Sequence, residues 1–193
     1  MMTISNEEQQ SIRNKSAKPM LYLAMIAMCM IFAGLTSAYM VRSADPGWLK
    51  FDLPFMFYIS TAVIAASSLT MYFALRSAMK DNFSNITTGL SLTFILGLVF
   101  IFCQFKAWSS LVAQGIFLTG PGSNPAGSFL YVISGAHLVH LIGGILMLIF
   151  VGIKSLKKLY HSKNLLGLQL SSIFWHFLGL LWVYLFLFMY FTH

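Results

Sequence analysis

The chain has 193 residues, of which 58% are hydrophobic, 16% aromatic and only 9% charged. These proportions are typical of an integral membrane protein and exclude a soluble globular domain. Lys and Arg exceed Asp and Glu, which gives a net charge of +7. We interpret this excess as a topology signal and a source of anionic-lipid contact, and we expect no nucleic-acid binding.

Five stretches without Asp, Glu, Lys or Arg are each long enough to cross about 30 Å of hydrocarbon as a helix. Because the connections between them are short, the sequence predicts an all-α membrane bundle and no separate soluble domain. We expect a polar cytoplasmic segment at residues 1–18 and a transmembrane domain at 19–193. The predicted spans are about 19–40, 54–75, 85–105, 128–153 and 165–191.

The distribution of basic residues predicts the orientation of the bundle. The N-terminal segment and the second and fourth loops carry nine of the twelve Lys and Arg, and the opposite side carries three. Short loops rich in these residues stay on the cytoplasmic side. We therefore expect the N-terminus inside and His193 outside. The first 18 residues are too polar for a signal-peptide core, so the first span is expected to be retained.

Histidines inside the spans are the candidate functional residues. His137 and His140 lie three residues apart in the fourth predicted span, and His176 lies in the fifth. Polar rings at bilayer depth usually face a bundle interior. Gly135 and Gly143 flank the histidine pair and would let a neighbouring helix approach closely.

Two interpretations of these histidines remain open. Two helices that each offer an imidazole could clamp one haem iron between His176 and either His137 or His140. Alternatively, the rings hydrogen-bond backbone carbonyls or lipid headgroups and hold helices together, and the scarcity of polar partners favours this second interpretation. Metal catalysis and a proton pathway are disfavoured, because no predicted span contains Asp or Glu.

Basic residues at the predicted inner side form a candidate lipid-binding group. Each surface cation there can attract anionic lipid by about 1 kcal/mol. The simpler alternative is that these residues act only as a topology signal. The candidates are Arg76 after the second span and Lys154, Lys157 and Lys158 after the fourth.

Two motifs in the last two spans resemble a known family. Residues 134–144 (SGAHLVHLIGG) resemble the paired-histidine helix of subunit III of the haem-copper respiratory oxidases, the cytochrome c oxidase subunit 3 family. Residues 174–177 (FWHF), followed by Trp182 and Tyr190, resemble its closing helix. The length of the chain fits the five-helix bacterial form, which lacks two additional N-terminal helices.

The resemblance implies a subunit without a catalytic site or cofactor of its own. Such a subunit would pack beside subunit I, bind phospholipid, and support proton uptake and catalytic lifetime, while haem and copper would reside in partner subunits I and II. It would lie in the bacterial inner membrane, and a larger respiratory supercomplex would be a further partner. The residues that match the motifs, His137, His140, Trp175 and His176, would then be inter-helix anchors, with Gly135 and Gly143 beside them.

Three departures from the family pattern separate this chain from many relatives. Met28, Ala107 and Gly179 stand where acidic residues are frequent in the family, so the resemblance implies no proton-handling role for these positions. The electron donor is also left open, as either cytochrome c or a quinol. Alternative identities are an accessory subunit of a quinol oxidase or nitric oxide reductase, and a small membrane b-type cytochrome with histidine ligands.

Overall fold

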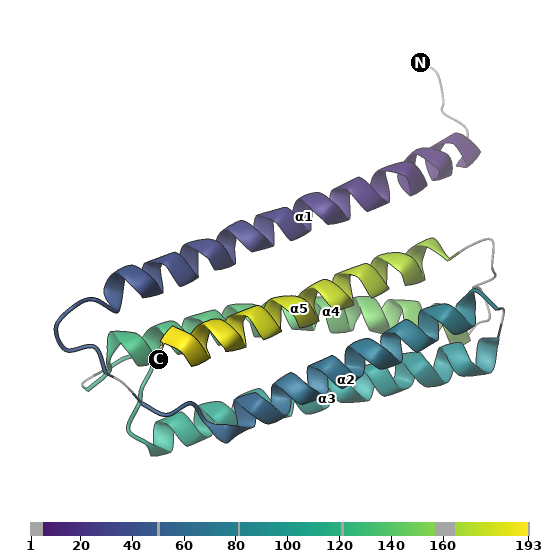
Figure 1. Ribbon diagram of the computed structural model, residues 1–193. Helices are drawn as coiled ribbons and strands as arrows, with labels where there is room; N and C mark the ends of the chain where they lie inside the picture. The colour runs from purple at the N-terminus through teal and green to yellow at the C-terminus, as the bar shows by residue number, and fades with distance from the viewer. Residues whose placement is uncertain (1–5, 50, 81, 121, 157–164, 193) are drawn as a thin grey trace.

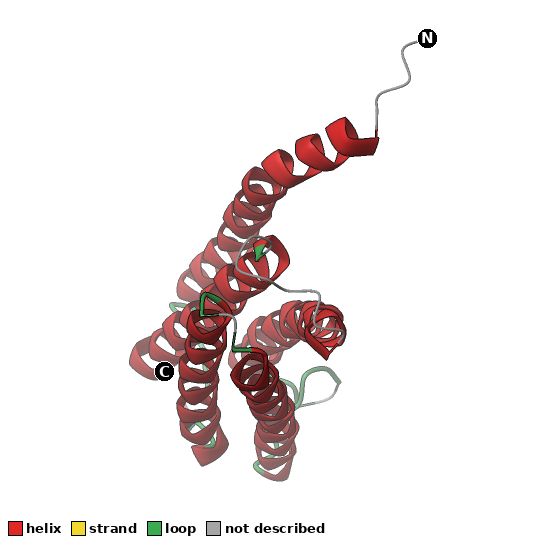
Figure 2. Ribbon diagram, turned by 90° about the vertical axis from the view of Figure 1, so that its right-hand side faces the viewer, coloured by secondary structure: helices red, strands yellow, loops and turns green. Residues whose placement is uncertain are grey.

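The computed structural model describes residues 6–49, 51–80, 82–120, 122–156 and 165–192. Over these residues the chain forms five α-helices and no strand (Figures 1 and 2). All five are long and apolar enough to cross a membrane, which confirms the predicted all-α class. The helices are α1 (Asn6–Arg42), α2 (Phe55–Ala78), α3 (Phe83–Ala113), α4 (Pro125–Leu156) and α5 (Leu166–Thr192).

Two helices extend well beyond the stretches that hydropathy marked out. α1 starts before Pro19, because a helix can continue through polar residues into water. α3 continues past Lys106, whose side chain is exposed and whose Nζ lies 5.6 Å from the centroid of the Phe102 ring. The apolar stem of a lysine can stay on a helix surface while its ammonium group turns outward. A charge therefore ends an apolar stretch without ending the helix.

Helices α2, α3, α4 and α5 form a closed ring, and α1 lies outside it. The interface between α2 and α3 is the most extensive, and α3 also packs on α4, α4 on α5, and α5 on α2. α1 contacts only α4 and α5, and Figure 2 shows its first turns leaning away from the other helices. Helices α1, α3 and α5 begin at one end of the bundle, called here the N-terminal end, and α2 and α4 finish there (Figure 1).

At the opposite end of the bundle, the side-chain amide of Asn124 links two segments of the chain by hydrogen bonds. Asn124, just before α4, donates from Nδ2 to the carbonyl of Gly47 at 2.9 Å. Its Oδ1 accepts from the backbone N–H of Ala126 at 2.9 Å and from that of Leu49 at 3.4 Å. The loop after α1 is thereby tied to the start of α4.

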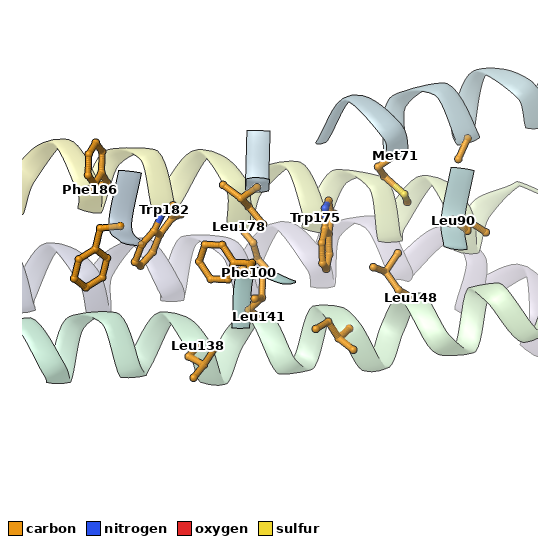
Figure 3. Packing of buried hydrophobic residues seen from close by; sticks show 14 of the residues in the cluster. Met71, Leu90, Phe100, Leu138, Leu141, Leu148, Trp175, Leu178, Trp182 and Phe186 are labelled. Carbon is orange, nitrogen blue, oxygen red and sulfur yellow. The ribbon is translucent and has the colours of Figure 1, made fainter. Parts of the chain in front are cut away.

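Close helix packing in the ring depends on small residues. A Cβ placed on Gly89 of α3 would lie 2.8 Å from the Cβ of Ala74 on α2, so a larger residue would force these two helices apart. Helices in lipid gain little from the hydrophobic effect and associate largely through such close contacts. The side chains at the centre of the four-helix ring are apolar, and many are aromatic. Figure 3 shows three of these buried side chains from α5, Trp175, Leu178 and Trp182.

Candidate functional site

Trp175 of α5 joins all four helices of the ring. Its indole N–H donates to the hydroxyl of Ser67 on α2 at 3.1 Å. Its six-membered ring lies against two glycines: a Cβ on Gly97 of α3 would be 2.9 Å from Cη2, and one on Gly144 of α4 would be 3.4 Å from Cε3. The side chain is only 1% exposed. The fold thus places the predicted anchor residue Trp175 where three neighbouring helices meet α5 (Figure 3).

Three further N–H donors cross between helices in the same way. Trp182 Nε1 donates to Thr61 Oγ1 at 3.0 Å, and Gln104 Nε2 donates to Ser60 Oγ at 3.0 Å. Trp108 Nε1 donates to a hydroxyl on α4 at 3.0 Å. With the Trp175 bond, these four contacts link α5 to α2, α3 to α2 and α3 to α4. Interhelical hydrogen bonds in membranes contribute about 0.6 kcal/mol each on average.

Each accepting hydroxyl also donates a hydrogen bond to a backbone carbonyl of its own helix. Ser60 and Thr61 both donate to the carbonyl of Phe57, at 2.9 and 2.8 Å. Ser67 donates to the Ile64 carbonyl and Ser134 to the Leu130 carbonyl, both at 2.7 Å. A hydroxyl can accept and donate at once. These small residues therefore satisfy a side chain from the next helix without leaving a buried O–H unpaired.

His137 lies at the centre of the bundle without a hydrogen bond. It is 0% exposed, and neither ring nitrogen has a hydrogen-bond partner among the described residues. Its ring centroid lies 5.0 Å from that of Trp182, 5.9 Å from Phe100 and 6.4 Å from Phe32. These rings come from α5, α3 and α1. The histidine thus meets its neighbours through ring packing, and the expected carbonyl bond is not formed there.

The other two predicted histidines occupy less enclosed positions. Nδ1 of His140 lies 2.7 Å from the carbonyl of Ala136, one turn earlier on α4, which is the backbone pairing expected from the sequence. Its ring also lies 5.7 Å from that of Phe32. His176 is partly buried, and its Nδ1 has no hydrogen-bond partner among the described residues.

The structure separates the glycines near the histidines by their surroundings. Gly135 is partly buried, and a Cβ there would lie 4.0 Å from Trp108. Gly143 is exposed, and nothing lies within 4 Å of a Cβ placed on it. Its neighbour Gly144 has the close contacts, with Leu178 Cδ1 2.9 Å from a Cβ. Within this chain the close approach to α5 therefore occurs at Gly144.

The packing around His137 leaves no room for a haem that this histidine could bind as an axial ligand. Phe32, Phe100 and Trp182 crowd its ring, so a porphyrin could reach it only by displacing side chains of the core. In the ranges that the structure describes, no three or more His, Cys, Asp or Glu side chains are grouped as metal ligands. The arrangement supports a packing role for His137.

Two of the predicted lipid-binding residues, Arg76 and Lys154, lie at the N-terminal end of the bundle. Arg76 on the last turn of α2 is exposed, and so is Lys154 on the last turn of α4. The Nζ of Lys154 lies 4.3 Å from the centroid of the Phe150 ring. Lys157 and Lys158 fall outside the described residues.

Sequence reasoning missed the hydroxyl groups that act as acceptors in this network. A signal for the acceptors was present: Ser60 and Ser67 lie seven residues apart and so share one face of an apolar helix, where polar residues need partners.

At Gly179 a Cβ would lie 3.0 Å from Ser68 Oγ. An acidic side chain at that position would be crowded against α2.

Comparisons with known proteins agree with the resemblance seen in the motifs. The family model described as cytochrome c oxidase subunit III matches residues 14–193. A cytochrome bo(3) ubiquinol oxidase subunit 3 from Pseudomonas aeruginosa is 27% identical over 170 residues, 86% of this chain and 79% of the relative. A probable cytochrome c oxidase subunit 3 from Nocardia farcinica is 29% identical over 173 residues, 84% of this chain and 81% of the relative. The cytochrome c oxidase subunit 3 of Corynebacterium diphtheriae is 26% identical over 170 residues, again 84% and 81%.

The matched range reaches into all five helices and includes the indole, hydroxyl and glycine contacts described above. The chain belongs to the cytochrome c oxidase subunit III family.

Proposed function

We propose that this chain is the non-catalytic subunit III of a proton-pumping haem-copper terminal oxidase in a bacterial inner membrane, where it packs on subunit I. The family match over residues 14–193 carries this proposal. Haem and copper would reside in subunits I and II, and this chain would bind phospholipid and no cofactor. Its structured core supports a scaffold role, since four side-chain N–H donors, on Gln104, Trp108, Trp175 and Trp182, join helices to one another.

The proposal assigns an indirect role in proton uptake and catalytic lifetime. None of the five membrane-spanning helices contains Asp or Glu in its apolar stretch, and Met28, Ala107 and Gly179 carry no titratable group. Chains of intramembrane carboxylates are the usual proton relays. The subunit would therefore support proton uptake through its packing on subunit I and through bound lipid.

Purification of the tagged chain from native membranes in mild detergent tests this proposal. We expect subunits I and II at a fixed ratio by mass spectrometry, with an absorption spectrum in which all haem belongs to them. A chain that purifies alone with its own haem would overturn the proposal and support the small-cytochrome alternative.

The electron donor is the second question, because one similar relative is a ubiquinol oxidase subunit and others are cytochrome c oxidase subunits. We propose cytochrome c as the donor and a quinol as the alternative. Oxygen consumption by the purified complex with reduced cytochrome c, and separately with a reduced quinol, distinguishes them. The number of turnovers before inactivation, with and without this subunit, tests its support of catalytic lifetime.

His176 offers a test of the anchoring role. Its ring is only partly buried, so replacement by Ala should leave the core of the chain intact. We expect His176→Ala to loosen association with subunit I and to leave haem and copper per assembled complex unchanged. Loss of haem from intact complexes would contradict the anchoring role.

A further inference from the structure

A pocket of about 280 Å³ lies between α3 and α4 toward the N-terminal end of the bundle. Its lining is mostly aliphatic and aromatic, and none of the described residues that line it is charged. Several lining residues, among them Ile95, Ile149 and Ile153, are exposed on the outside of the helix pair. The pocket therefore opens toward the surface that faces the hydrocarbon of the membrane.

The absence of a side chain at Gly152 leaves space in the pocket. Gly152 of α4 lines the pocket, and nothing lies within 4 Å of a Cβ placed on it. Eight residues earlier on the same helix, the space beside Gly144 is occupied by the side chains of Trp175 and Leu178 of α5. Among the described residues, no side chain occupies the corresponding space beside Gly152.

Of the three side-chain hydroxyls that line the pocket, two are already paired. The hydroxyl groups of Thr87 and Ser155 lie 3.2 Å apart and hydrogen-bond across the two helices. Water enters cavities that offer it several polar partners, and apolar cavities stay dry. The occupant should therefore be apolar. A transmembrane helix is about 10 Å wide and cannot enter a hollow of this size.

We propose that this pocket holds a segment of one acyl chain of a phospholipid. The exposed cations Arg76 and Lys154 lie at the same end of the bundle and can attract its phosphate. This inference gives the lipid contact of the proposed function a definite place. It rests on that function only in requiring that the chain lies in a membrane.

Photolabelling of the purified complex tests the site. The complex is reconstituted in phosphatidylcholine and phosphatidylglycerol vesicles that contain a trace of phosphatidylglycerol with a diazirine in its acyl chain. After irradiation, labelled peptides are mapped by mass spectrometry. We expect label in residues 90–95 and 148–153. Gly152→Leu, which fills the pocket, should reduce that label several-fold.

Gly143→Leu is the matched control, because it makes the same change on the same helix at an exposed position that does not line the pocket. We expect wild-type labelling from it. Equal labelling of the two variants would overturn the proposal, since bulk lipid alone would then account for the label. Absence of label in the wild-type complex, as when a partner side chain fills the pocket, would also overturn it.

Should Gly152→Leu fail to assemble, Ser91→Leu narrows the same pocket from α3 and carries the same expectation. The outcome is independent of oxidase activity. A chain that carries the label but does not purify with subunits I and II would refute the proposed function and leave the lipid site standing.

Discussion

Helices α1 and α5 are both apolar over membrane length, but the bundle treats them differently. In the most apolar stretch of α5, 56% of the residues are buried within the structure, against 11% in that of α1. α5 contacts each of the other four helices and carries Trp175 and Trp182, which donate hydrogen bonds to α2. α1 meets the bundle chiefly through Phe32, Thr36 and Tyr39. Hydropathy predicts which segments enter a membrane, and only side-chain contacts show which become core.

Replacement of Trp175 by Ala should have the largest effect on this contrast. Truncation of a buried Trp costs about 3–5 kcal/mol because contacts are lost and a cavity remains. Here it would also leave the Ser67 hydroxyl without its donor. Met30→Ala on α1, where the side chain is 71% exposed, should change stability by less than about 0.5 kcal/mol. Thermal unfolding in detergent measures both variants, and equal destabilisation would contradict the comparison.

The adjacent glycines of α4 give a sharper comparison on one helix. Gly144→Leu would push a Cβ to within 2.9 Å of Leu178, and such overpacking costs about 1–3 kcal/mol. Gly143→Leu has open space and should stay within about 0.5 kcal/mol of the wild type. Unfolding of the two variants in the same detergent tests the assignment. The assignment of the close contact to Gly144 is wrong if Gly143→Leu lowers the stability of the isolated chain more than Gly144→Leu does.

His137 tests whether a polar group in the core contributes to stability. A buried polar group without a partner costs about 1–3 kcal/mol, so an apolar ring of similar shape should be neutral or stabilising by up to about 1 kcal/mol. We expect this of His137→Phe, measured by thermal unfolding. His140→Phe is the control that removes the contact with the Ala136 carbonyl. Destabilisation by His137→Phe beyond about 2 kcal/mol would show that the imidazole has a polar partner in the membrane.

The smallest expected effect concerns the polar link between α1 and α5. Thr36 Oγ1 lies 3.3 Å from the hydroxyl of Tyr184, and Thr36 also donates to the Phe32 carbonyl at 2.9 Å. Thr36→Val keeps the shape and should cost about 0.6 kcal/mol. Tyr184→Phe should cost a similar amount, and the double variant should cost no more than either single one, because the same bond is removed. Additive losses would show that the two hydroxyls act separately.

The number and order of the helices could be predicted from the sequence, because apolar length is a local property. The helix ends were less accessible. α3 extends to Ala113 past the charge of Lys106, and α4 begins at Pro125, where the missing proline N–H needs no partner. Both ends depend on local geometry that hydropathy does not record.

Much of the network at the core could not be predicted, since neighbouring positions on a helix differ in direction by about 100°. The motif around Trp175 indicated an anchor, but only the packed structure distinguishes Gly144 from Gly143 as its counterpart. The same holds for the histidines. Spacing placed His137 and His140 on adjacent sites of one helix, yet one is enclosed by rings and the other reaches a carbonyl of its own helix.

The position of α1 outside the four-helix ring has a consequence for synthesis. Among the described helices, its partners are α4 and α5, the last two to leave the ribosome. Synthesis proceeds from the N-terminus. During translation α1 must therefore reside in the membrane with no helix of its own chain against it, while α2 and α3 can already pair. The face of α1 that packs on α4 and α5 must therefore tolerate lipid first and protein later. The hydrogen bond from Asn124 to the Gly47 carbonyl can form only after the start of α4 has emerged.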